Sequence, residues 1–153
     1  MRATSRRSFL GFCVMGAAAA LSLRYLPPAH AAERLEVYKT PWCGCCTAWV
    51  DHMRGAGFDV RVTEMDDLDP LKMRLGVAPE LVSCHTGLIG GYVIEGHVPA
   101  REVQRLLSER PQATGLAVPG MPMGSPGMET DGPPDPYEVV LFAPGRHEIF
   151  ARY

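Results

Sequence analysis

Hydrophobic and polar residues alternate over 35–39 (Leu-Glu-Val-Tyr-Lys), the period-two pattern of a strand with one buried face. A cysteine-rich turn follows, and apolar residues at helical spacing then predict a helix over 47–56, which ends at glycines. The same reasoning predicts a strand at 58–65, a short helix at 71–75 opened by Asp69-Pro70, strands at 85–89 and 92–95 joined by Gly90-Gly91, and an amphipathic helix at 99–109.

This β-α-β-α-β-β-α order predicts an α/β fold of the thioredoxin-like type for residues 32–110, with the cysteines at the first strand-to-helix junction. Residues 111–136 are rich in Pro, Gly and Met, and we expect no regular structure there, only a linker or a ligand-bearing loop. Two strand-like runs around Pro144-Gly145 predict a C-terminal β-hairpin over 137–153, packed on the domain.

The first 31 residues have the features of an export signal. Arg6 and Arg7 lie in a run that resembles the twin-arginine motif, an apolar stretch follows, and Ala29-His30-Ala31 provides small residues for cleavage before Ala32. An uncleaved membrane anchor is the alternative, although the apolar stretch is short for a span of about 20 residues. The sequence therefore predicts a periplasmic protein without stable membrane insertion after signal removal.

Composition narrows the function further. The whole chain has 153 residues and a formal charge of −2, and the segment 1–31 holds four arginines and no acidic residue, so the remainder carries −6. This charge gives no basic surface for nucleic acid, and we expect no nucleic-acid partner.

Four cysteines remain after residue 31, namely Cys43, Cys45, Cys46 and Cys84. In an oxidising compartment such cysteines form disulfides, bind metal or carry out redox chemistry. The first three lie where a helix begins, and a helix N-terminus stabilises thiolates. Two chemistries fit: dithiol–disulfide exchange through Cys43 and Cys46, or soft-metal binding through the whole set. A structural domain with two disulfides is the plain alternative.

A third thiol within four residues favours metal. In a thiol–disulfide exchange enzyme a third neighbouring thiol would allow wrong disulfides to form, but it suits a group of metal ions bridged by sulfur. Cys84 is expected to face the first helix and to complete a set of four thiolates. One tetrahedral Zn²⁺ rarely takes three sulfurs from four consecutive residues, and thioether sulfur is a good ligand for Cu(I). We therefore expect copper, with Cu(I) favoured.

Further candidate ligands are three histidines and the loop methionines. His85 adjoins Cys84, and in a regular strand the two side chains would point to opposite faces. His52 follows Cys45 by two helical turns (about 10 Å) and can bind only a further ion of a larger cluster, whereas His97 can line the site from just before the last helix. Met121, Met123 and Met128 follow no core pattern and are candidate copper ligands, whereas Met53, Met65 and Met73 fall at apolar positions and are expected in the core.

Several segments also resemble one known family. The runs YKTPWCGCC (38–46), SCHT (83–86), GYVIEGHVPA (91–100) and GLAVPGMP (115–122) resemble the CopG-like copper-resistance proteins, a domain of unknown function with the number 411. The resemblance implies a thioredoxin-like fold, several copper ions bound by cysteine sulfur, and a role in copper tolerance that involves a change of copper's oxidation state. It implies that Cys43, Cys45, Cys46 and Cys84 are copper ligands, with terminal ligands drawn from His52, His85, His97, Met121 and Met123 in an assignment that the resemblance leaves open.

The resulting hypothesis is a periplasmic copper-binding protein with a polynuclear Cu(I)–thiolate site, which acts in copper resistance, is redox-active, and exchanges copper with other periplasmic copper-handling proteins. Whether it turns over as an enzyme stays open. The rival hypothesis is a thiol–disulfide oxidoreductase with Cys43 as nucleophile and Cys46 as resolving thiol.

Overall fold

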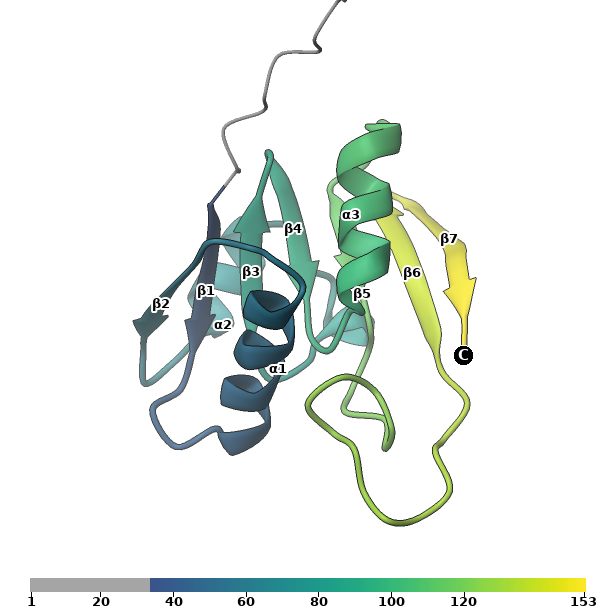
Figure 1. Ribbon diagram of the computed structural model, residues 1–153. Coiled ribbons are helices and arrows are strands. Elements are labelled where there is room, and N and C mark those ends of the chain that lie inside the picture. The colour runs from purple at the N-terminus through teal and green to yellow at the C-terminus, as the bar shows by residue number, and fades with distance from the viewer. Residues whose placement is uncertain (1–33) are drawn as a thin grey trace, which may run out of the picture.

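A computed structural model describes residues 34–153, which form one seven-stranded mixed sheet in the order β2-β1-β3-β4-β5-β6-β7 (Figure 1). Helices α1 and α3 cover one face of this sheet and α2 lies on the other (Figure 1). The α/β class is as predicted. The predicted export signal, residues 1–31, lies outside the described residues. Over residues 34–153, no helix has the length and apolar character needed to cross a bilayer.

The first half of the fold places the cysteines. Strand β1 (Leu35–Lys39) pairs parallel to β2 (Val60–Glu64), and α1 (Gly44–Gly55) connects them. The helix begins three residues before the predicted start because Cys43 acts as its N-cap, with its sulfur accepting a hydrogen bond from the Cys46 backbone N–H at 3.3 Å. Cysteines 45 and 46 therefore lie in the first turn of α1.

The next elements follow the predicted order. Helix α2 spans Asp69–Arg74, a 3₁₀ turn spans Pro79–Leu81, and β3 (Thr86–Ile89) and β4 (Tyr92–Glu95) form the expected antiparallel hairpin. Strand β3 also pairs antiparallel to β1, so it lies at the centre of the cysteine-bearing half of the sheet. Helix α3 spans Ala100–Glu109.

The prediction that residues 111–136 contain no regular structure was wrong. Strand β5 (Gly115–Ala117) pairs parallel to β4 and antiparallel to β6, so its backbone groups are satisfied by neighbours on both sides. Only glycine fits at position 115, because a Cβ there would lie 1.8 Å from the Val93 carbonyl oxygen. Three residues are too few to give a periodic signal, so tertiary pairing decides this strand.

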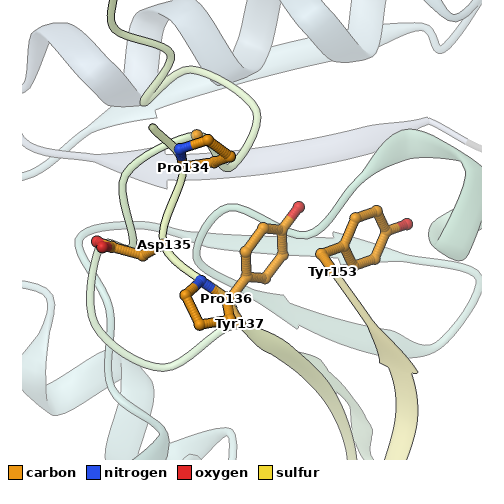
Figure 2. Close-up of a pocket in the computed structure, with 6 residues that line it drawn as sticks. Pro134, Asp135, Pro136, Tyr137 and Tyr153 are labelled. Carbon is orange, nitrogen blue, oxygen red and sulfur yellow. The ribbon is translucent and has the colours of Figure 1, made fainter. Parts of the chain in front are cut away.

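The chain ends in a hairpin that extends the same sheet. Strand β6 (Glu138–Ala143) pairs with β5, and β7 (Arg146–Arg152) forms the edge. At the open end of this hairpin the rings of Tyr137 and Tyr153 stack, with centroids 4.8 Å apart. They line a shallow pocket of about 410 Å³ together with Pro134, Asp135 and Pro136 (Figure 2).

Two apolar layers hold the sheet. The larger lies under α1 and α3 and includes Trp49, Met53 and Ile94. The smaller lies on the opposite face and includes Val93 and Phe142, so consecutive residues of β4 face opposite layers. Met53 is fully buried as predicted, but Met73 is 72% exposed. The core prediction for Met73 was wrong because the short α2 buries the two preceding residues, 71 and 72, and turns the next one outward.

Candidate metal centre

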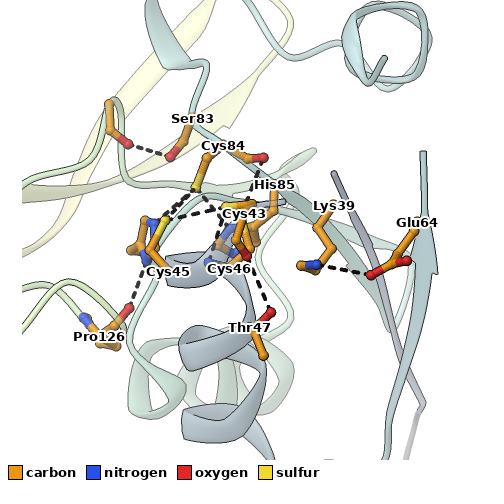
Figure 3. Close-up of a disulfide and its surroundings, with 12 residues drawn as sticks. Lys39, Cys43, Cys45, Cys46, Thr47, Glu64, Ser83, Cys84, His85 and Pro126 are labelled. Atoms are coloured by element: carbon orange, nitrogen blue, oxygen red, sulfur yellow. Dashed lines mark hydrogen bonds and ion pairs between the residues drawn. A yellow bond between two sulfur atoms is a disulfide. The ribbon is translucent and has the colours of Figure 1, made fainter. Parts of the chain in front are cut away.

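The sulfur-bearing centre forms where the start of α1 meets the segment that enters β3 (Figure 3). Cys43 and Cys46 are joined by a disulfide, and Cys45 and Cys84 are free thiols. The Cys45 Sγ atom lies 3.4 Å from the Cys43 Sγ atom and 3.9 Å from the Cys84 Sγ atom. All four sulfur atoms lie within 4.8 Å of one another. The structure thus brings together the four cysteines that the sequence singled out.

Two buried histidines adjoin this group. The Nδ1 atom of His85 is 3.3 Å from the Cys84 Sγ atom, and the Nε2 atom of His97 is 3.1 Å from the same sulfur. Regular strand geometry would separate the side chains of residues 84 and 85, but β3 begins only at Thr86, so both side chains turn to the same side. The segment between β4 and α3 carries His97 to the same place.

The tautomer of His97 follows from its second contact. Its Nδ1 atom lies 2.8 Å from the Pro126 carbonyl oxygen, which can only accept a hydrogen bond, so Nδ1 carries the proton. The Nε2 atom of the neutral ring therefore presents a lone pair to Cys84. Metal-binding histidines in proteins are oriented by this kind of second hydrogen bond.

Burial disfavours charge on both histidines and on Cys84. It lowers the pKa of both His85 and His97, and each ring is fully buried. It also raises the pKa of the Cys84 thiol to about 12, with the neighbouring Cys45 acting in the same direction. A metal cation reverses this balance for a thiol, because coordination replaces the proton.

A buried ion pair holds the Cys84 segment in place. Lys72 on α2 lies with its Nζ atom 2.5 Å from Glu95 Oε1 on β4, and the two side chains are 5% and 0% exposed. The Glu95 carboxylate also accepts hydrogen bonds from the Thr86 hydroxyl at 2.7 Å and the Ser83 backbone N–H at 2.8 Å. Burial raises the pKa of Glu95, although Lys72 acts in the opposite direction. The sequence pattern gives no sign of this network, because a lysine on a short helix is usually solvent-exposed.

The proline-rich loop closes over the centre. The Gly120 backbone N–H donates to Val82 O at 3.1 Å, and the Ser83 hydroxyl donates to Gly120 O. At Gly127 the loop touches the first turns of α1 so closely that a Cβ would lie 2.7 Å from both Cys45 O and Trp49 N. Together with the Pro126–His97 hydrogen bond, these contacts fix the loop on the site at three points.

The remaining predicted ligands are one histidine of α1 and two methionines of the loop. His52 accepts a hydrogen bond from the Ala100 backbone N–H at 3.1 Å through Nε2. Among the described residues, the histidine–cysteine groups within 4.8 Å do not include His52. Met121 and Met123 are carried by the covering loop, and their side chains are 52% and 37% exposed. The described cysteine–histidine groups thus leave out His52, whereas Met121 and Met123 stay candidate ligands carried by the covering loop.

Comparison with known proteins agrees with the chemistry of this centre. A family described as "Protein of unknown function, DUF411" matches residues 81–128, which include Cys84, His85 and His97. No curated protein matches the chain. A solved structure named copper resistance protein CopG, form 2, is 42% identical, covers 79% of this chain and 98% of its own, and has a TM-score of 0.75. Form 1 is also 42% identical, with 78% and 96% covered and a TM-score of 0.74. With this identity over nearly the whole length of the relative, the chain belongs to the family of the copper resistance protein CopG.

Proposed function

We propose that this protein binds several Cu(I) ions in the periplasm through Cys43, Cys45, Cys46 and Cys84, and that it acts in copper resistance. The observation that carries the proposal is the convergence of four cysteine sulfurs, from two segments 38 residues apart, within 4.8 Å. Thiolate is a soft ligand that selects Cu(I) over harder ions. Four sulfurs at this spacing can bridge neighbouring ions, which favours a polynuclear site.

Copper binding by all four cysteines requires the Cys43–Cys46 disulfide to be open, since a disulfide sulfur is not a thiolate ligand. Reduction provides four thiols, and each loses its proton when it binds the cation. Burial raises the pKa of the Cys84 thiol to about 12, so the cation has to displace a proton that this thiol holds firmly. Burial of the centre then keeps water from competing for the metal.

Histidines and methionines complete the proposal. His85 and His97 serve as terminal ligands, because both ring nitrogens nearest the cluster face Cys84. Met121 and Met123 are exposed on the covering loop, and we assign them to the receipt of copper from a partner protein. His52, held by α3, serves no ion in this arrangement.

The fold type, the export and the redox role of the protein are also part of the proposal. The order β1-α1-β2-α2-β3-β4-α3, with β3 antiparallel to β1 and β4, supports a thioredoxin-like core to which β5–β7 are added. The twin-arginine-like residues 5–10 support export. Copper that changes oxidation state in the site would also pass electrons to a partner.

A thiol–disulfide oxidoreductase is the second candidate function. The observation in its favour is the Cys43–Cys46 disulfide itself, which lies at the N-terminus of α1, where a thiolate is stabilised. This candidate predicts insulin reduction by the metal-free protein. It also predicts that a Cys46→Ser variant traps a mixed disulfide through Cys43.

The direct experiment titrates Cu(I) against a competing chelator into the purified, fully reduced protein. We expect more than one copper per chain. The C43S/C45S/C46S variant should lose all but at most one ion, whereas Met73→Leu, which changes an exposed sulfur outside the site, should bind like the wild type. A reduced wild-type protein that binds no copper, or a triple variant that keeps the whole load, contradicts the proposal.

A further inference from the structure

When the Cys43–Cys46 disulfide is closed, the centre still has three candidate ligands for one metal ion on one side. The disulfide joins Cys43 and Cys46, both at the start of α1. Cys84, His85 and His97 come from the segments that flank β3 and β4, and their ligand atoms form a second group within 4.8 Å of one another. This group keeps its geometry while the disulfide is closed.

From this geometry we infer that Cys84, His85 and His97 form a one-copper subsite that remains available when Cys43 and Cys46 are joined. The redox state of that pair then sets how many copper ions the protein holds. The inference rests on the proposed function, because it assigns copper to the same centre, and it adds a regulation of that centre.

Hydrogen bonding in the metal-free subsite is incomplete. The His97 Nε2 lone pair faces Cys84, so the single S–H proton of Cys84 donates to it. His85 Nδ1 faces the same sulfur and can donate its proton to it, but the Nε2 atom of that ring is then a buried acceptor without a hydrogen-bond partner. A cation bound by the sulfur and by both facing nitrogens would replace the protons between these atoms, and the His85 proton would then lie on Nε2.

The distances fit a metal after a small expansion. With metal–sulfur and metal–nitrogen bonds of about 2.3 Å and 2.0 Å, sulfur and nitrogen ligands of one ion lie about 3.5–3.7 Å apart. The Cys84 sulfur is 3.1 Å from His97 and 3.3 Å from His85, so each contact opens by a few tenths of an ångström. One cysteine with two histidines is a ligand set that copper uses in proteins.

Contacts with neighbouring residues hold the three candidate ligands in the orientation that metal binding needs. Pro126 O fixes the His97 ring, and the Trp49 ring lies 4.4 Å from the His85 ring between centroids. Glu95 binds the Ser83 N–H directly before Cys84. Ligands that are oriented before the metal arrives lose little conformational entropy when they bind it.

The disulfide then acts as a capacity switch. Its opening takes two electrons and two protons from a dithiol reductant, breaks the Cys43–Cys46 sulfur–sulfur bond and gives two thiols, while the reductant becomes a disulfide. Cys45, 3.4 Å from Cys43, and Cys84 keep their thiols in both states. The oxidised protein thus holds one copper ion, and the reduced protein holds the larger load.

The test compares both redox states of the same protein. Protein that starts at Ala32 and has two free thiols per chain, counted with a thiol reagent after denaturation, is titrated anaerobically with a Cu(I)–acetonitrile complex, and a dithiol-reduced sample is titrated in parallel. We expect one copper per chain in the oxidised sample and more in the reduced one. If the reduced sample binds none, the proposed function fails; if only the oxidised sample binds none, this inference alone is overturned.

Variants identify the ligands of that one ion. His97→Gln keeps a donor for Pro126 O but removes the imidazole. This variant and a separate Cys84→Ser variant should each lose copper binding in the oxidised state. The reduced His97→Gln protein should still bind more than one ion through its cysteines. His147→Ala, a change at a partly exposed histidine on β7, is the control and should retain the ion. Retention of the oxidised-state copper in both site variants overturns the inference.

Discussion

Replacement of Lys72 by methionine should destabilise the protein strongly, because it leaves a carboxylate buried without its cation. The Glu95 side chain is fully buried, and Lys72 Nζ lies 2.5 Å from its Oε1 atom and 2.9 Å from the Thr86 hydroxyl. Loss of one partner of a buried pair typically costs about 3–5 kcal/mol. For a domain of this size, that corresponds to a decrease in Tm on the order of 10–20 °C.

The assay is urea unfolding of the reduced, metal-free protein, followed by tryptophan fluorescence. Arg34→Met is the matched control, since the Arg34–Asp59 pair has similar chemistry but side chains that are 56% and 52% exposed. We expect no measurable loss there, because solvent screens such pairs. A Lys72→Met/Glu95→Gln double variant should recover much of the stability, because no charge then stays buried and the amide can still accept from Ser83 N–H. A loss below about 1 kcal/mol in Lys72→Met, or no recovery in the double variant, would refute the reasoning.

Three further substitutions test the contacts around the centre. Gly127→Ala should lift the loop and accelerate copper dissociation, because residue 127 has a φ of +86° and a Cβ there would lie 2.7 Å from Cys45 O. Gly132→Ala is the control, since a Cβ at residue 132 would lie 3.6 Å from the nearest atom. Equal dissociation rates for the two variants would count against the loop contact. Trp49→Phe should lower the free energy of unfolding in urea by about 1–3 kcal/mol, since Val98 O loses its buried donor at 2.9 Å; an unchanged midpoint would contradict this. Met121→Leu should slow copper uptake from a Cu(I) chelator without a change in the number of ions bound, and an unchanged rate would remove Met121 from the route.

Local patterns predicted the elements well. The Gly90-Gly91 pair indicated the β3–β4 hairpin, and both glycines have positive φ, +59° and +85°. The start of α1 was placed too late because cysteine is not among the usual N-cap residues, although the Cys43 sulfur fills that role here. Strand β5 could not be predicted, since its three residues are held by partners that are distant in sequence.

The site was predictable in its chemistry but not in its geometry. Cysteine spacing indicated a sulfur-rich site, yet only the folded chain shows that residue 84 lies outside a regular strand and faces the same side as His85. The proximity of His97 depends on the path of the chain between β4 and α3. Likewise, nothing in the local pattern of α2 indicates that Lys72 reaches Glu95.

Copper K-edge X-ray absorption of the reduced, copper-loaded protein tests the central claim most directly. If the four cysteine sulfurs bind copper together, the spectrum will show Cu(I) with a first shell dominated by sulfur, and a copper–copper contribution from ions that share bridging thiolates. A first shell of oxygen and nitrogen alone would contradict the account.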